Sequence, residues 1–207
     1  VLSWRKFKRI VNKAIKNDDM FANRVVPEQS ECRLADELKH IMKNEVHVID
    51  IAKLPEDKQA FVFGDAVKTI YNLKLGEYDN ESVSPPSRII IFIDELNKYA
   101  SSDVPKSSPI LRQILDVTER GRSLGVILFG AEQFRSSIHK RVTGNCATHA
   151  YGRTNTIETS TGEYKSLPDT YRNMLTRLSQ GEYLIQNPVF RSLLKIRFPK
   201  PIYKQFK

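Results

Sequence analysis

The sequence predicts an α/β domain with a mostly parallel sheet flanked by helices, a small helical appendage at the N-terminus and a β-hairpin at the C-terminus. From Glu45 onward, short apolar runs alternate with amphipathic stretches, which is the pattern of successive βαβ units. Residues 88–94 are almost continuously apolar, as expected of a strand buried on both faces of a parallel sheet. A length of 207 residues suits one domain of this kind with a small appendage.

The appendage is predicted over residues 1–44, as two helices. Ser3 is a candidate N-cap for the first, which should end near residues 17–19, because apolar residues recur there at helical spacing while Lys and Arg fill the opposite face. The second helix is expected over about residues 30–44, where an apolar stripe consists of Leu34, Leu38, Ile41 and Met42.

The α/β domain is predicted over residues 45–207. A strand at 46–52 should lead to a helix after Pro55, and the proline-containing loop 76–87 should lead to the central strand 88–94. Further along the chain we expect a loop at 100–108, a helix at 109–121, strands at 126–130 and 147–152, a helix at 167–178, and a hairpin formed by 182–187 and 190–197.

Composition excludes several classes of protein. Hydrophobic residues make up 40% and charged residues 28% of the chain, with a mean hydropathy of -0.42, which fits neither a disordered chain nor a membrane protein. Cys32 and Cys146 form no CxxC pair, so we expect neither a disulfide scaffold nor a cysteine zinc site, and a reducing cytoplasm fits. The chain opens at Val1 without a signal-peptide core, so we expect a piece of a longer protein.

The formal net charge of +9 is concentrated at the two ends of the chain. Residues 1–44 hold ten Lys/Arg against six Asp/Glu, and residues 186–207 hold six Lys/Arg and no acid. Basic flanks around a nearly neutral middle suit contact with a polyanion such as nucleic acid, or with an acidic partner. The alternative is a solvated basic surface.

The stretch with the clearest chemistry is Ile89-Ile90-Ile91-Phe92-Ile93-Asp94-Glu95-Leu96. An apolar strand that ends in Asp-Glu is the Walker B pattern of ATPases, and it places two carboxylates at the sheet edge where open α/β folds bind ligands. Asp94 is suited to hold Mg²⁺, directly or through water, and Glu95 to orient and polarise the attacking water. The alternative is a strand that ends in a solvated acidic turn.

Three further side chains follow in the order that such an ATPase needs. Arg122 ends a predicted helix just before strand 126–130, where an arginine can project toward the nucleotide of a neighbouring subunit. Gln133 lies just beyond that strand, where it could contact the γ-phosphate or the water, and Arg153 ends the next strand on the same edge of the predicted sheet. Taken singly, each also fits a surface arginine, a polar strand-end cap or a salt-bridged arginine.

Three segments carry a resemblance to a known family: IIIFIDEL, RGRSLGVILFGAEQFRSSIHKRVTGNCATHAYGRT and RLSQGEYLIQNPVFRSLLKIRFPKP. Through them, residues 45–201 resemble the HerA-type ATPases of the FtsK/HerA superfamily. The resemblance implies a RecA-like P-loop NTPase core, ATP and Mg²⁺ as ligands, and a homo-hexameric ring that translocates double-stranded DNA. By similarity Asp94 and Glu95 match Walker B, Arg122 the arginine that reaches into the adjacent subunit, and Gln133 the polar sensor. Family members often act with a nuclease partner in DNA-end processing, whereas others belong to anti-phage or conjugation systems.

One departure from the family is large. None of the nine glycines begins a P-loop, G-x-x-x-x-G-K-[ST], whose amides and lysine hold the phosphates. The family places that loop upstream, so we expect the chain to be the C-terminal portion of the ATPase, inactive by itself. The alternatives are a degenerate relative that serves as a non-hydrolysing DNA-binding or ring-scaffolding module, and a nucleotide-independent interaction domain.

Overall fold

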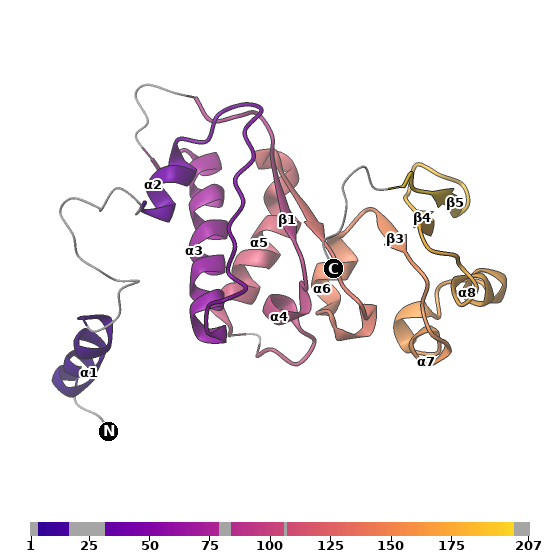
Figure 1. The fold of residues 1–207 in the computed structure, drawn as a ribbon, viewed down its shortest axis with the longest axis horizontal. Helices are drawn as coiled ribbons and strands as arrows, with labels where there is room; N and C mark the ends of the chain where they lie inside the picture. The colour runs from indigo at the N-terminus through magenta and orange to yellow at the C-terminus, as the bar shows by residue number, and fades with distance from the viewer. Residues whose placement is uncertain (1–3, 17–31, 79–83, 106, 201–207) are drawn as a thin grey trace.

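The computed structural model describes residues 4–16, 32–78, 84–105 and 107–200 (Figure 1). It confirms a mixed α/β protein. The described strands form two sheets, a parallel pair and a three-stranded antiparallel sheet. The expectation of one mostly parallel sheet is therefore wrong for the described residues, because the strand His149–Tyr151 pairs with the C-terminal hairpin and not with the parallel pair.

The parallel pair consists of β1 (Ile89–Ile93) and β2 (Val126–Gly130), which are in register along their full length. They are connected by α4 (Asn97–Ala100) and α5 (Pro109–Leu124). The start of α5 follows from local chemistry, because the Ser108 side chain accepts a hydrogen bond from the Leu111 amide and Pro109 occupies the first turn. These strands and this helix confirm the predicted βαβ unit.

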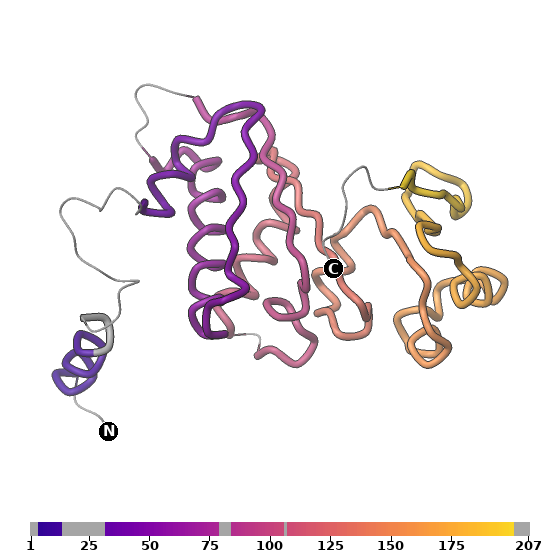
Figure 2. The backbone as a smooth tube through the Cα atoms, viewed as in Figure 1, coloured from indigo at the N-terminus to yellow at the C-terminus, as the bar shows by residue number. Residues whose placement is uncertain are grey.

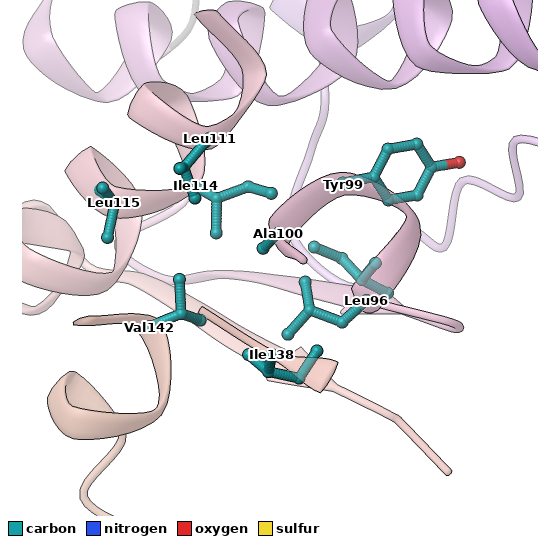
Figure 3. Packing of buried hydrophobic residues seen from close by; sticks show 9 residues of the cluster. Leu96, Tyr99, Ala100, Leu111, Ile114, Leu115, Ile138 and Val142 are labelled. Atoms are coloured by element: carbon teal, nitrogen blue, oxygen red, sulfur yellow. The ribbon is translucent and has the colours of Figure 1, made fainter. Parts of the chain in front are cut away.

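One face of the parallel pair is covered by helices. The long helix α3 (Glu56–Leu75) begins after Pro55 as predicted and lies on the same side of the strands as α5 (Figure 1). Apolar residues of α3, α5 and both strands share one buried cluster. A second cluster joins α4, α5 and α6 (Lys140–Asn145) near the carboxyl end of β1 (Figure 3). These clusters fix the turn after β1 in place.

The opposite face of the parallel pair is uncovered in the described part of the chain. The side chains of Ile90, Phe92, Ile127 and Phe129 are 53%, 76%, 37% and 51% exposed, respectively. The rings of Phe92 and Phe129, which are register partners, stack with centroids 4.8 Å apart. The prediction that strand 88–94 is buried on both faces is therefore wrong here, because the described residues supply no second layer.

The antiparallel sheet has a hydrophobic core of its own. Its strand order is β3 (His149–Tyr151), β4 (Glu182–Gln186) and β5 (Leu194–Arg197), so the predicted hairpin is confirmed. With α7 (Thr156–Thr159) and α8 (Asp169–Leu175) it forms a separate unit that the chain enters after α6 (Figure 2). The buried cluster there consists of Tyr151, Tyr164, Leu167, Leu175, Leu178 and Leu184.

The first predicted helix is confirmed as α1 (Trp4–Lys16), with Trp4 and Phe7 stacked and exposed. The second is shorter than predicted: α2 spans Leu34–Lys39 and ends at His40, whose backbone leaves the helical region. Asn44 then takes a left-handed conformation, which stops any continuation toward the predicted end of this helix. The end of the first helix, the middle of loop 76–87 and the tail 201–207 lie outside the described residues.

The predicted strand 46–52 is wrong for the described residues. This segment has no strand assignment, and Val46 and Val48 are 87% and 85% exposed. A strand is defined by its pairing, and nothing described pairs with this segment. The alternation of apolar residues in this segment is typical of a β-strand, but no described strand forms hydrogen bonds with it. Only Ile51, near its end, packs against a buried cluster.

Gly125, which joins α5 to β2, should tolerate no other residue. Its φ is +74°, and a Cβ there would lie 2.2 Å from the Ser87 carbonyl oxygen. We expect Gly125→Ala to lower the free energy of unfolding by about 2 kcal/mol or more, measured by urea denaturation. Gly144→Ala in α6 is the matched control, because a Cβ there meets nothing within 4 Å. Equal stability of the two variants would contradict this account of the junction.

Candidate functional site

Asp94 and Glu95 form the turn directly after β1, as the sequence predicts, and backbone hydrogen bonds tie this turn to the segment after β2. The Ala131 amide donates to the Ile93 carbonyl at 2.8 Å, and the Leu96 amide donates to the Ala131 carbonyl at 3.1 Å. Both strands are parallel, so these segments share the carboxyl edge of the sheet. The two carboxylates therefore project from a rigid base.

Glu95 has an unusual backbone conformation. Its φ is +52°, in the left-handed region that residues with a Cβ seldom adopt. The Asp94 carboxylate supports this turn by accepting a hydrogen bond from the Glu95 amide at 3.0 Å. A glutamate held in such a conformation costs about 1 kcal/mol or more, and such costs concentrate at functional sites. The strain is therefore an independent indication that this carboxylate has a role.

The Glu95 carboxylate forms an ion pair with Lys98, one turn further on. This hydrogen bond raises the pKa of the Lys98 ammonium above its usual value. Both side chains are about half exposed, at 50% and 45%, so the pair adds little stability. A loosely held pair leaves the Glu95 carboxylate available to another ligand or to a water molecule.

Glu132 organises the other half of this edge, although the sequence did not single it out. One of its carboxylate oxygens accepts from the Asn97 amide at 2.8 Å, at the start of α4, and the other accepts from the Gln133 amide at 2.6 Å. Glu132 thus connects the turn that carries Asp94 and Glu95 to the loop that carries Gln133. Its position directly after an apolar strand was the available signal.

The structure therefore brings Asp94, Glu95 and Gln133 to one edge, but it does not bring Arg122 there. Arg122 is exposed in the last turn of α5, which precedes β2, so it lies at the opposite, amino end of that strand. Gly121 allows the close approach, because a Cβ there would lie 2.7 Å from the Val126 carbonyl oxygen. Within its own chain, Arg122 cannot act on ligands held by Asp94.

Arg153 follows β3, which belongs to the antiparallel sheet and not to the parallel pair. The expectation that Arg153 ends a third strand of the same sheet is therefore wrong for the described residues. Arg153 lines an open pocket together with Thr154, Asn155, Thr156 and Thr176.

A magnesium ion fits this edge only with help from other ligands. Within the described ranges no three His, Cys, Asp or Glu side chains gather as a metal site. Mg²⁺ typically takes one or two carboxylates and completes its shell with water and substrate phosphates, which suits the exposed Asp94 carboxylate. Cys32 and Cys146 are both free thiols. No described helix is long and apolar enough to cross a membrane.

No protein-family model matches the sequence, and no curated protein matches it either. Solved structures of the genome packaging NTPase B204 from Sulfolobus turreted icosahedral virus 2 do match in fold. The complex with AMPPCP has a TM-score of 0.55 at 18% identity, covering 84% of this chain and 73% of that chain. The complex with ATP-gammaS has a TM-score of 0.53 at 17% identity, covering 82% and 72%. The chain therefore has a fold similar to that of a genome packaging NTPase.

Proposed function

We propose that this chain forms the metal-binding and water-activating part of a HerA-type ring ATPase of the FtsK/HerA superfamily. The observation that carries the proposal is the Asp94–Glu95 turn at the carboxyl end of a parallel strand, with Glu95 held at a φ of +52°. The fold similarity to a packaging NTPase solved with ATP analogues supports it. The intact ring would couple ATP hydrolysis to movement along double-stranded DNA.

Each side chain at the edge has a distinct role in this proposal. Asp94 would hold Mg²⁺, which when bound neutralises charge on the phosphates of ATP. Glu95 would orient the attacking water and accept its proton. Gln133 would contact the γ-phosphate or that water from the adjacent loop. Arg122 would serve the site of a neighbouring subunit, and Arg153 would assist in nucleotide binding from the antiparallel unit.

We infer that the phosphate-binding loop lies outside these 207 residues, since the sequence contains no G-x-x-x-x-G-K-[ST]. The uncovered face of the parallel pair supports this inference. A P-loop connects a strand to a helix, and such a unit needs a sheet edge to extend and a sheet face to cover. The second edge of β2 has no partner among the described strands, and Phe92 and Phe129 offer the apolar face.

Double-stranded DNA is the proposed partner of the intact ring, and the basic flanks are the proposed contacts. In the described residues α1 carries Arg5, Lys6, Lys8, Arg9, Lys13 and Lys16 and no acid. We assign residues 1–44 to a basic appendage and 45–207 to the ATPase domain, acting in the cytoplasm and away from membranes. A nuclease partner in DNA-end processing, an anti-phage system and a conjugation system are the family roles that stay open for the intact protein.

The proposal predicts that the 207-residue chain by itself binds ATP only weakly. Without amides and a lysine that hold the phosphates, the Asp94 side of the site offers the nucleotide little beyond metal contacts. Calorimetric titration with ATP and Mg²⁺ should reveal no micromolar site, whereas a longer polypeptide that includes the P-loop should bind tightly. Micromolar binding by the 207-residue chain would overturn the proposed division of the site.

A further inference from the structure

Arg135 opens the short helix η2 (Arg135–Ser137), two residues after Gln133, and its guanidinium reaches across to the antiparallel sheet. Its Nη1 atom lies 3.0 Å from His149 Nδ1 and donates to the Tyr151 hydroxyl at 3.1 Å. The guanidinium carbon also lies 5.5 Å from the centre of the Tyr151 ring. One side chain thus contacts two successive residues on the same face of β3.

This contact is built entirely from neutral partners. No carboxylate of the described residues pairs with Arg135, and its Nε is buried without a hydrogen-bond partner among them. Burial, together with the neighbouring Arg135 charge, lowers the pKa of His149 to about 4, so the imidazole is neutral near pH 7 and can accept. The Tyr151 hydroxyl in turn donates to Gln186 of β4 at 2.8 Å. Arg135 is only partly buried, but its buried Nε and its lack of a carboxylate partner among the described residues make the contact a weak source of stability, so its geometry needs another explanation.

The next residue strengthens the same connection. Both the amide and the hydroxyl of Ser136 donate to the buried Glu158 carboxylate of α7, at 2.9 and 2.7 Å. At its other side this segment is tied to α4, since the Ser102 amide donates to the Ser137 carbonyl and the His139 amide to the Ala100 carbonyl, each at 2.8 Å. The segment therefore lies between the Asp94–Glu95 turn and the antiparallel unit.

We propose that Arg135 is a positioning residue that holds the loop carrying Gln133 in a fixed place relative to β3 and to Arg153 beyond it. Arg153 lies two residues after Tyr151, just beyond the end of β3. By holding the side chains of His149 and Tyr151, Arg135 would fix the position of β3 and, with it, the backbone position of Arg153. This inference rests on the proposed ATPase function and adds to it a residue that touches neither nucleotide nor water.

The first test uses hydrogen exchange on the 207-residue chain and needs no ATPase activity. The Gln133 amide is protected by its hydrogen bond to Glu132, so its exchange rate reports on the loop. Arg135→Met should speed exchange of the Gln133 amide severalfold, while the Ala131 amide, bonded to Ile93, stays unchanged. Arg141→Met is the matched control, because Arg141 pairs with Glu119 at an exposed site.

The second test uses the longer polypeptide with its P-loop. Small displacements of catalytic groups lower the rate of catalysis strongly. Arg135→Met should therefore lower kcat for ATP hydrolysis by about 10–100-fold. The KM for ATP should stay within about twofold, because binding contacts lie elsewhere. Arg141→Met should leave both unchanged. Tyr151→Phe, which removes only the accepting hydroxyl, should shift exchange and kcat in the same direction by less, and it replaces Arg135→Met if that variant does not fold.

The outcomes separate the two proposals. Unchanged exchange at Gln133, or accelerated exchange with an unchanged kcat, would overturn the positioning role of Arg135. A longer wild-type polypeptide that binds ATP but never hydrolyses it would overturn the proposed function, while the exchange experiment would still decide whether Arg135 holds the loop. Equal losses in kcat for Arg135→Met and Arg141→Met would show a general loss of folding and would also contradict the assignment.

Discussion

Replacing Glu95 by Gln in the longer ATPase should lower kcat by roughly 10²–10⁴, the usual contribution of a general base. A neutral amide cannot accept the proton of the attacking water, whereas nucleotide affinity should change little because the phosphates are held elsewhere. Steady-state phosphate release measures the first effect and calorimetric titration with ATP measures the second. Glu119→Gln, at an exposed position on α5, is the control that should leave both unchanged.

The backbone of Glu95 allows a sharper version of this experiment. Glycine accepts a φ of +52° without strain, so Glu95→Gly should be at least as stable as Glu95→Gln and yet equally inactive. That combination of results would show that the loss of activity comes from the missing carboxylate and not from a change in the stability of the turn. Ordinary hydrolysis by either variant would make Glu95 a structural acid and remove the Walker B assignment.

Arg122 should act on the site of a neighbouring subunit, and its loss should lower kcat by about 10³–10⁵. It is exposed at the amino end of β2, away from its own Asp94, so it can reach only a ligand held by another copy. Lys should not replace it, because the planar bidentate geometry is lost. Arg120, two positions earlier on a different side of the helix, is the competing candidate.

Mixed rings test this arrangement. Arg122→Ala subunits and Glu95→Gln subunits should each be inactive alone, but mixing them creates some sites with an intact Glu95 facing an intact Arg122. Activity should therefore return in part, measured by phosphate release at several mixing ratios. If subunit exchange is demonstrated and the ring does not need concerted firing, absence of recovery would place Arg122 in a structural role.

The elements that the sequence predicted well are those with a local signal. The apolar runs of β1 and β2, the Ser108–Pro109 start of α5 and the Pro55 start of α3 all appear at or near the expected residues. Strand 46–52 and the two-sided burial of β1 failed for a shared reason. Pairing and burial depend on a partner layer, and the described residues do not supply one.

The candidate site divides in the same way. Asp94, Glu95 and Gln133 could be predicted because residues that follow parallel strands meet at one edge. The left-handed backbone conformation of Glu95 could not be predicted, since nothing in the Asp94-Glu95 sequence favours that conformation. Glu132 offered only its position after an apolar strand as a signal, and its bond to the Asn97 amide follows from the tertiary arrangement. Arg135 contacts β3, which is distant in sequence, so only the tertiary arrangement reveals that contact.

The most direct measurement is the rate of phosphate release from ATP by the longer polypeptide, with Mg²⁺, in the presence and absence of double-stranded DNA. The proposed function predicts hydrolysis that requires Mg²⁺, rises severalfold with DNA, and falls by roughly 10²–10⁴ in Glu95→Gln. ATP binding without hydrolysis under either condition would contradict it and would favour a non-hydrolysing DNA-binding or ring-scaffolding module.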